Sequence, residues 1–363
     1  MRIVDCKLSV LSIPFQRQFF SSTVTLKKYD FVLISLETDE GIDGLGYVVT
    51  PGYGSSSFYA VIKDELVPLL LGENPFNVEL LWEKMWKRTH FFGRKGSPIF
   101  GMAALDMALW DIIGKVCGQP LYKILGAYST DIPVYASGGW LAYSKEELLR
   151  EMTDYVEEGY TMVKMKIGQK NFQEDYNRLK AVRKAVGDKV KIMVDANQSW
   201  SSLEAIQAGK RLEELGIYWL EEPVIADEIE GQAEVTRSLD VAVAAGETEY
   251  TRYGFKDLIT NKCMDIVQPD YFRVGGITEW RKVAALAEIW HLPISPHSHM
   301  EIQAHLMASI ANGFALENHT LLRGYMEKVF EGLPEVKDGI LKPSEFPGTG
   351  FKLLPNVEEK YGK

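Results

Sequence analysis

From residue 164 onward, acidic, basic and amide side chains stand at the ends of short apolar runs. These residues are Lys164, Lys166, Asp195, Asn197, Glu221, Glu222, Glu247, Asp270, His297 and Glu317. One acid after a strand is usually a helix cap or a surface residue. Seven successive runs that end in ionisable groups indicate a shared site instead, because converging groups of this kind bind cations and transfer protons.

Asp195, Glu221 and Glu247 end three consecutive runs and predict a metal site. Three like charges would repel one another in a partly dry pocket, and a divalent cation removes that conflict. Oxygen ligands with room for water and substrate suit Mg²⁺ better than zinc. Glu222 is expected to face away from Glu221, because neighbouring strand residues alternate in direction, and Glu249 is the weaker candidate beside Glu247.

Two further pairs predict proton transfer. Lys164 and Lys166 are two residues apart on one run, so both point to the same face. Two close ammonium groups lower each other's pKa, and a lysine tuned in this way acts as a base near neutral pH. Asp270 and His297 end neighbouring runs and predict an oriented acid–base dyad. His299 lies on the same side, and spacing alone does not exclude it.

The elements that position these residues repeat one unit from Ile132 onward. Short apolar runs alternate with segments long enough for one helix each: IPVYAS, VKMKIG, IMVDAN, YWLEEP, AVAAGE, DIVQPD, PISPHS and FALENH. Ser144 with Glu147, and Ser201 with Glu204, are capping boxes at two helix starts. Eight βα units predict a closed (β/α)8 barrel, in which chemistry occurs at the carboxyl ends of the strands. An open doubly wound sheet is the alternative, but no run leads into a GxGxxG turn.

The residues on either side of the repeated units carry weaker patterns. Residues 3–14 and 31–41 predict strands, with a glycine-rich turn at Gly41, Gly44 and Gly46. Residues 16–30 and 91–97 predict loops. Residues 347–355, PGTGFKLLP, predict a strand that rejoins the N-terminal part.

Composition excludes several classes of protein. A chain of 363 residues suits two domains or one large barrel with additions, and its net charge of −10 argues against binding to nucleic acid or to anionic membranes. Three distant cysteines form neither a disulfide framework nor a zinc pattern. Without a signal peptide or a spanning segment, the sequence predicts a cytoplasmic protein.

Taken in order, these stretches resemble the enolase superfamily, in particular its mandelate racemase-like group. The matching stretches are VKMKIG, VDANQSW, WLEEP, AAGE, VQPDYFRVGGIT, SPHSH and LEN. The resemblance implies an α+β capping domain at residues 1–126, the barrel at 127–318, and a C-terminal segment at 319–363 that returns to the cap. It also implies assembly as a homo-oligomer, up to an octamer.

The resemblance assigns roles to the residues found above. Asp195, Glu221 and Glu247 would hold Mg²⁺, with Asn197 beside the metal and a substrate hydroxyl. Lys166, influenced by Lys164, would be the base on one face of the substrate. His297, paired with Asp270, would serve the other face. Glu317 would donate a hydrogen bond to the substrate carboxylate.

The shared chemistry of this group is removal of the proton α to a carboxylate. Loss of a β-hydroxyl then gives a dehydratase, and proton return to the opposite face gives a racemase or epimerase of a 2-hydroxy acid. The stretches YASGGWL and GRKG, with PDYFRVGGIT, look most similar to acid-sugar dehydratases of the talarate/galactarate type. This resemblance implies dehydration of a sugar acid, aldaric or aldonic. Ser22, Arg94 and Lys95 are the expected substrate-binding loop residues, and Arg94 and Lys95 suit a doubly acidic substrate. A non-catalytic sugar-acid-binding barrel is the third alternative, although it would need no base on each face.

Overall fold

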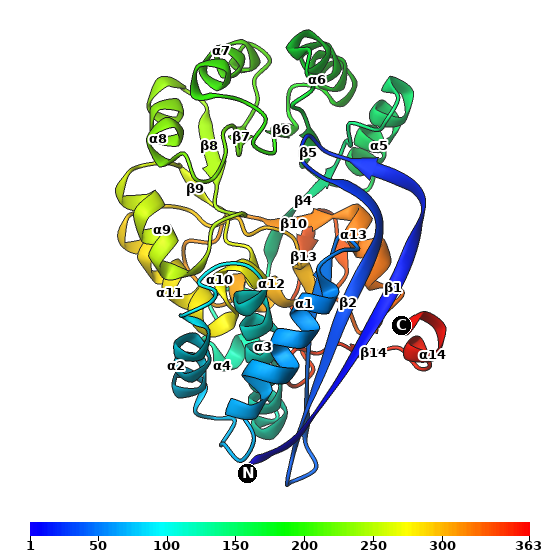
Figure 1. The fold of residues 1–363 in the computed structure, drawn as a ribbon. Helices are drawn as coiled ribbons and strands as arrows, with labels where there is room; N and C mark the ends of the chain where they lie inside the picture. Colours follow the sequence, from blue (N-terminus) through cyan, green and yellow to red (C-terminus); the bar gives the residue numbers. More distant parts are fainter.

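The computed structural model describes residues 1–363, and its N-terminal part combines a three-stranded antiparallel sheet with helices (Figure 1). Its elements are β1 (Ile3–Phe20), β2 (Thr25–Thr38), β3 (Asp43–Thr50), α1 (Ser55–Ala60), a π-helical segment (Val61–Leu66), a 3-10 turn (Val67–Leu69), α2 (Val78–Thr89), α3 (Ser97–Cys117) and α4 (Leu121–Ile124). The sheet packs on α3, and we call this part the cap.

The first two strands are longer than the sequence predicts. They pair from Ile3 with Thr38 to Phe20 with Thr25, so residues 16–30 form a hairpin rather than a loop, and only residues 21–24 turn. In Figure 1 this hairpin runs from the base of the cap to the barrel near β5. The length matters because it carries the tip of the cap to the mouth of the barrel.

Two of the glycines predicted to form a turn lie in β3 instead. A Cβ atom on Gly44 would lie 2.1 Å from the carbonyl oxygen of Ala108, and one on Gly46 would lie 2.0 Å from that of Ala104. Only Gly41, with φ of +74°, occupies the turn. Glycine at the other two positions lets β3 approach the backbone of α3, which no larger residue allows.

The predicted (β/α)8 barrel is confirmed. Its strands are β4 (Ile132–Gly138), β5 (Met162–Lys166), β6 (Lys191–Asp195), β7 (Trp219–Glu221), β8 (Ala242–Ala245), β9 (Ile266–Val267), the short segment 293–297, and β10 (Leu316–His319). β4 to β9 pair in parallel in chain order. Ile294 bridges Val267 on one side and Gly313 on the other, and β10 pairs with β4, which closes the barrel.

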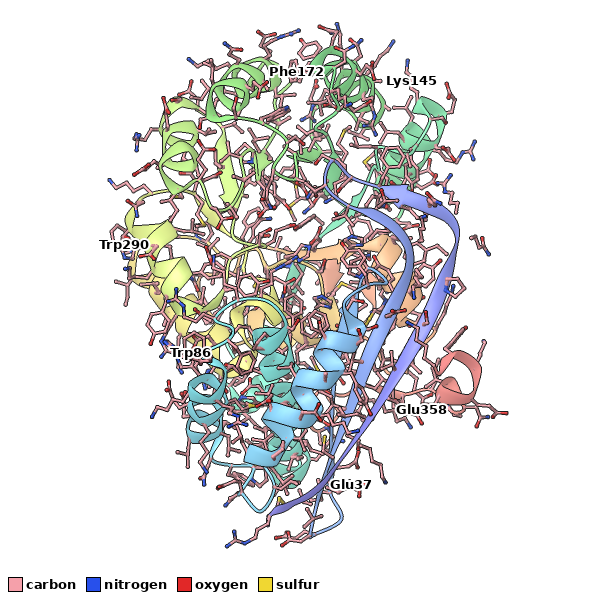
Figure 2. The ribbon with its side chains drawn as sticks, in the orientation of Figure 1. Glu37, Trp86, Lys145, Phe172, Trp290 and Glu358 are labelled. Atoms are coloured by element: carbon pink, nitrogen blue, oxygen red, sulfur yellow. The ribbon has the colours of Figure 1, made fainter.

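Helices surround the strands. They are α5 (Lys145–Glu157), α6 (Phe172–Val186), α7 (Ser202–Glu213), α8 (Ile229–Ser238), α9 (Thr251–Thr260), α10 (Tyr271–Val274), α11 (Ile277–Ile289), α12 (Met300–Met307) and α13 (Thr320–Met326). Both predicted capping boxes are confirmed, at Ser144 and at Ser201. Figure 2 shows Lys145, Phe172 and Trp290 on the outer side of this ring. None of the helices combines the length and apolar composition that crossing a bilayer requires.

The lower interior of the barrel is packed with apolar side chains. They are Tyr135, Met162, Met193, Trp219, Ala244, Ile266 and Ala315. Tyr135 and Trp219 meet edge to face at 5.3 Å between ring centroids. The Lys164 ammonium lies 5.4 Å from the centroid of the Tyr135 ring. The charged side chains at the strand ends therefore lie directly above these packed apolar residues. The site is therefore closed from below and open only toward the cap.

Hydrogen bonds and a continuous apolar core join the cap to the barrel. Trp82 Nε1 donates to the carbonyl oxygen of Gly275 at 2.8 Å, and the Tyr271 hydroxyl donates to that of Ala103 at 2.8 Å. Buried Asp106 accepts from the backbone N–H and the hydroxyl of Thr278 at 2.9 and 2.6 Å. These contacts hold the cap over the strand ends.

The C-terminal segment contacts both parts. Its elements are β11 (Phe330–Glu331), β12 (Val336–Lys337), β13 (Ile340–Leu341), β14 (Lys352–Leu353) and α14 (Val357–Tyr361). The β12–β13 hairpin adds to the first residues of β4, which the sequence did not predict. Residues 347–355 lie outside the barrel, where Leu121 N–H donates to Gly348. Glu358 of α14 accepts from Ser9 on β1 at 2.5 Å (Figure 2).

Candidate active site

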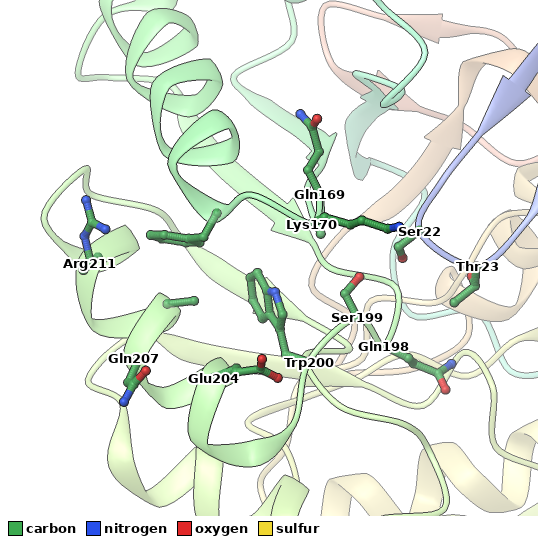
Figure 3. Close-up of a pocket in the computed structure, with 13 residues that line it drawn as sticks. Ser22, Thr23, Gln169, Lys170, Gln198, Ser199, Trp200, Glu204, Gln207 and Arg211 are labelled. Atoms are coloured by element: carbon green, nitrogen blue, oxygen red, sulfur yellow. The ribbon is translucent and has the colours of Figure 1, made fainter.

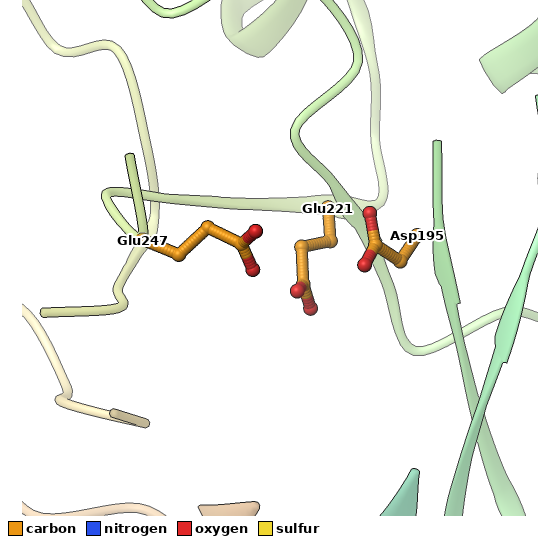
Figure 4. Close-up of side chains that lie close together, drawn as sticks. All are labelled: Asp195, Glu221 and Glu247. Atoms are coloured by element: carbon orange, nitrogen blue, oxygen red, sulfur yellow. The ribbon is translucent and has the colours of Figure 1, made fainter. Parts of the chain in front are cut away.

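Three carboxylates converge at the ends of β6, β7 and β8 (Figure 4). Asp195 and Glu221 are the last residues of their strands, and Glu247 follows β8 by two residues. Each offers an oxygen within 4.8 Å of the others, and all three side chains are buried. Oε2 of Glu247 is buried without a hydrogen-bond partner. A divalent cation fits this arrangement, because it pairs with the orphaned oxygen and balances the buried charge.

Neighbouring donors fix two of these carboxylates. Glu221 accepts from Trp219 Nε1 at 3.0 Å and from Gln268 Nε2 at 2.9 Å. Asp195 accepts from the backbone and side-chain N–H groups of Asn197 at 2.8 and 3.0 Å. Burial and the adjacent carboxylates raise the pKa of Glu221 to about 8, against the opposing effect of Lys164. The protein groups alone therefore leave an excess of negative charge that a cation would relieve.

The two lysines pair with carboxylates rather than acting mainly on each other. Lys164 Nζ lies 2.6 Å from Glu221 Oε1 and 2.8 Å from Glu317 Oε1, and Lys166 Nζ donates to Asp195 Oδ2. Burial is the largest effect and lowers the pKa of Lys166, but the surrounding carboxylates, Asp195 foremost, together outweigh it and the pKa is raised. This direction is the opposite of the lowering that the sequence predicts. Proximity in sequence says nothing about the acids that a barrel brings from other strands.

The dyad is present as predicted in position. His297 Nδ1 lies 2.7 Å from Asp270 Oδ2, while Asp270 Oδ1 accepts from the backbone N–H groups of Phe272 and Arg273 at 2.9 Å each. Asp270 is thus both the cap of α10 and the partner of the imidazole. Burial opposes the charged imidazolium, but Glu247 and Asp270 raise the pKa of His297 to about 9. His297 Nε2, 3.5 Å from Glu247 Oε2, is the atom that can face a substrate.

Glu317 and His299 have different surroundings. Glu317 Oε2 accepts from Ser298 N–H at 2.8 Å, beside the loop that carries the dyad. His299 instead packs on the Phe272 ring at 4.4 Å, and its Nδ1 lies 3.3 Å from the hydroxyl of Tyr47 in the cap. His299 therefore links the cap to the barrel and is not part of the dyad.

A cavity of about 630 Å³ opens above these groups. The predicted site residues that line it are Lys166, Asn197, Glu247, Asp270 and His297. Asp195, Glu221, Lys164 and Glu317 are buried behind them, at 0 to 1% exposure. The volume of the cavity is in the range of small-molecule sites. The cap forms the wall of the cavity that faces these barrel residues.

A second cavity, of about 660 Å³, lies outside the barrel between α6 and α7 (Figure 3). Figure 3 shows Lys170 and Ser22 at one end, Trp200 in the middle and Arg211 at the other end. None of the metal-site or dyad residues lines this cavity. The first cavity is therefore the candidate active site.

The expected substrate-binding loop residues do not line the active-site cavity. Arg94 is exposed, and Lys95 Nζ pairs with Glu249 at 3.1 Å. The Ser22 hydroxyl donates to the carbonyl oxygens of Ala196 and Asn197 at 2.9 and 3.0 Å, which ties the hairpin tip to the barrel. In this structure each of these side chains has a partner in the protein or faces solvent, and their role in substrate binding stays a prediction.

Other residues line the cavity without having been predicted. Glu222 does so because its φ of +38° turns the chain after β7, so it does not face away as strand alternation suggests. Arg273, Thr50 and His319 line it too. Arg273 follows Asp270 by one helical turn, a spacing that the sequence displays. No signal in the sequence marks Thr50, because only the docking of the cap brings it to the barrel.

The fold is a (β/α)8 barrel with an α+β cap. Acids end the third and fourth strands of the barrel, and another acid follows the fifth. This is the architecture of the enolase superfamily. Residues 7–126 match the model of the mandelate racemase / muconate lactonizing enzyme N-terminal domain, and residues 147–357 match that of the enolase C-terminal domain-like family. The chain therefore belongs to the mandelate racemase/muconate lactonizing enzyme group of the enolase superfamily.

Relatives with different named activities resemble this chain. An arabinonate dehydratase from Saccharolobus solfataricus is 38% identical over 92% of this chain and 90% of its own. The L-talarate/galactarate dehydratase from Salmonella typhimurium is 33% identical over 97% of this chain and 89% of its own. The crystal structure of a racemase from Streptomyces coelicolor with bound magnesium superposes with a TM-score of 0.95 at 30% identity, covering 99% of this chain and all (100%) of the other.

Proposed function

We propose that this protein is a Mg²⁺-dependent dehydratase of a sugar acid, which it converts to a keto-deoxy acid. The observation that carries the proposal is the placement of two proton-transfer groups in one cavity. Lys166 stands on the second strand and His297 on the seventh, and Glu247 of the three-carboxylate site lines the same cavity. A substrate bound beside that site has a proton-transfer group on each face.

Asp195, Glu221 and Glu247 would hold the metal, and when bound Mg²⁺ would stabilise the negative charge that develops on the substrate carboxylate. It would also compete for Asp195, which now accepts from Lys166. Asn197 Oδ1 is buried without a partner, so it is placed to accept from a substrate hydroxyl. Burial raises the pKa of Glu317, but Lys164 and His297 hold it well below its usual range. Glu317 is therefore a carboxylate here, and it would donate to the substrate carboxylate only after taking up a proton.

The proposed reaction begins when the proton-transfer group on one face of the substrate removes the α-proton. Lys166 Nζ, as the free amine, takes the α-proton from one configuration, and neutral His297 Nε2 takes it from the other. The electron pair of the broken C–H bond forms the new double bond, and the C–O bond at the β-carbon breaks. His297 gives the departing hydroxyl a proton to form water: the α-proton it has just taken or, when Lys166 is the base, the proton of its own imidazolium, whose pKa is about 9. The enol product takes up a proton at the β-carbon and becomes the 2-keto-3-deoxy acid.

A racemase or epimerase of a 2-hydroxy acid is the second candidate. The two opposed groups favour it, because proton removal at one face and return at the other inverts the α-carbon without loss of hydroxyl. The similarity to the Streptomyces coelicolor racemase supports this alternative.

A library of aldonic and aldaric acids, incubated with the protein and Mg²⁺ in D₂O, tests the proposal. Keto-acid formation seen by ¹H NMR supports the dehydratase, and α-deuteration with inversion but no keto acid supports the racemase. Tight binding without deuteration would instead identify a binding protein.

A further inference from the structure

The cap presents an uncharged wall to the active-site cavity. None of the cavity residues contributed by residues 1–126 is Asp, Glu, Lys, Arg or His. The polar ones include Ser21, Thr23, Thr50, Tyr53, Ser57 and Ser97. The reactive carboxylate of a substrate belongs beside the metal site, so the other end of the molecule meets this wall.

Three lysines lie close to this wall in the chain: Lys27 is exposed and lies outside the cavity, and the other two are paired with acids. Lys28 Nζ lies 3.1 Å from Asp30 Oδ1, and Lys95 Nζ lies 3.1 Å from Glu249 Oε1. Neither residue lines the cavity. A second substrate carboxylate at this end would therefore lose its hydration without gaining an ion pair.

Cations on the barrel side do not compensate. Lys166 donates to Asp195, and Arg273 Nη1 donates to the Glu247 carbonyl oxygen at 2.8 Å and lies 3.5 Å from Asp270 Oδ2. Glu222 also lines the cavity. A second carboxylate would meet the acids Glu222 and Asp270 there. Arg273, whose Nη1 is already engaged, has only Nε and Nη2 left to offer, so repulsion from the acids offsets its attraction.

The start of α3, which reaches the cavity at Gly96 and Ser97, offers few donors for an anion. Pro98 has no N–H, and the N–H groups of Ile99 and Phe100 both donate to the Gly96 carbonyl oxygen, at 3.0 and 3.3 Å. Of the first helical residues only Ser97 has a free N–H, so this helix start offers one donor rather than the several by which helices bind carboxylates.

The wall instead suits neutral hydroxyl groups. Oγ1 of Thr50 has no hydrogen-bond partner although the residue is only 2% exposed, and it lines the cavity. A buried hydroxyl without a partner is costly, and a substrate hydroxyl can donate to it and accept from it. Ser57 and Ser97 add a hydroxyl pair whose oxygens are 2.9 Å apart.

We infer that the substrate is a monocarboxylic polyhydroxy acid, of the aldonic class, whose uncharged hydroxyl end binds Thr50 and the Ser57–Ser97 pair. Aldaric acids, with a carboxylate at both ends, are disfavoured. The inference rests on the proposed function, and it narrows the sugar acids to those with one carboxylate.

Matched acids that differ only at the far carbon test it. Galactonate is compared with galactarate, and arabinonate with arabinarate, by kcat/KM for keto-acid formation and by Kd from calorimetry with Mg²⁺. In whichever pair the protein accepts, we expect kcat/KM to be roughly 10- to 100-fold higher, and binding correspondingly tighter, for the aldonate than for its aldarate. The reason is that the second carboxylate of the aldarate stays unpaired.

Two test variants and one control variant distinguish an effect of the wall on substrate choice from an effect on folding. Ser57→Lys adds a cation at an exposed position on the cavity. It should lower the ratio of kcat/KM for the aldonate to kcat/KM for the aldarate at least about tenfold. Ser56→Lys, exposed on the same helix but off the cavity, is the matched control and should leave the ratio unchanged. Thr50→Val should raise the aldonate KM about tenfold without lowering the unfolding temperature, because the lost hydroxyl has no partner in the protein.

An aldarate that binds and reacts as well as its aldonate overturns this inference and leaves the dehydratase proposal standing. Binding that favours the aldonate without any turnover refutes the dehydratase proposal and supports the assignment of the wall. If neither class binds, both are wrong.

Discussion

Replacing Asp270 by asparagine should abolish most catalysis at the His297 face while leaving the fold intact. Oδ1 of Asp270 accepts from the Phe272 and Arg273 N–H groups, and asparagine caps helices as well as aspartate does. The asparagine oxygen must occupy that position, which turns its NH₂ group toward His297 Nδ1. The imidazole then accepts at Nδ1 and carries its proton on Nε2, so Nε2 cannot take the α-proton.

The magnitude follows from the bond that is lost. His297 Nδ1 and Asp270 Oδ2 are 2.7 Å apart, in a pair whose aspartate side chain is 4% exposed. A charge-assisted hydrogen bond of this kind contributes about 1.5–3 kcal/mol, which corresponds to roughly 10- to 150-fold in rate. The wrong tautomer adds to this loss, and the same change in a serine protease triad costs about 10⁴-fold. We expect a fall in kcat between these limits.

The assay is ¹H NMR in D₂O with a sugar acid that the wild-type protein dehydrates. Keto-acid formation should fall, while α-proton exchange at the Lys166 face should persist. Asp106→Asn, a change at a buried aspartate of α3 that bonds Thr278 and neither member of the dyad, is the control and should keep the wild-type rate. Dehydration by Asp270→Asn within about threefold of wild type would refute the assigned role of the dyad.

Three further predictions concern the second base, the metal and the cap. Lys166→Ala should abolish α-proton exchange for one epimer and spare the other, measured by ¹H NMR in D₂O, and equal loss for both would contradict opposed bases. Removal of Mg²⁺ with a chelator should abolish turnover, and Glu247→Gln should weaken Mg²⁺ binding in calorimetry at least about tenfold, since the site loses one of its charges; full activity without metal would sink the metal assignment. Burial raises the pKa of Asp106 from 3.8 to about 7, so the native state holds this proton more tightly and the free energy of unfolding should fall as pH rises from about 4 to about 7. Asp106→Asn should flatten that fall in urea unfolding, and an unchanged pH slope would show that Asp106 does not carry it.

The architecture and the positions of the central residues were predictable from the sequence. The alternation of apolar runs with helical segments is a local pattern, and it confines the chain to parallel strands with helices outside. Strand direction then puts Asp195, Glu221 and His297 at one end of the barrel, because the carboxyl ends of parallel strands meet there. The capping boxes at Ser144 and Ser201 were predictable for the same reason, since each involves residues three apart.

The tertiary structure decided the pKa values of the site residues and which residues line the cavity. Lys166 has a raised pKa although burial lowers it, because the neighbouring strand supplies Asp195 and later parts of the barrel supply Glu221 and Glu247. Arg94 and Lys95 look suited to a diacid in sequence, yet one is exposed and the other pairs with Glu249. Thr50 reaches the cavity only because Gly44 and Gly46 let β3 lie against α3 while the cap docks on the barrel. Electrostatic and steric contacts between distant segments depend on how the parts pack, which local periodicity does not encode.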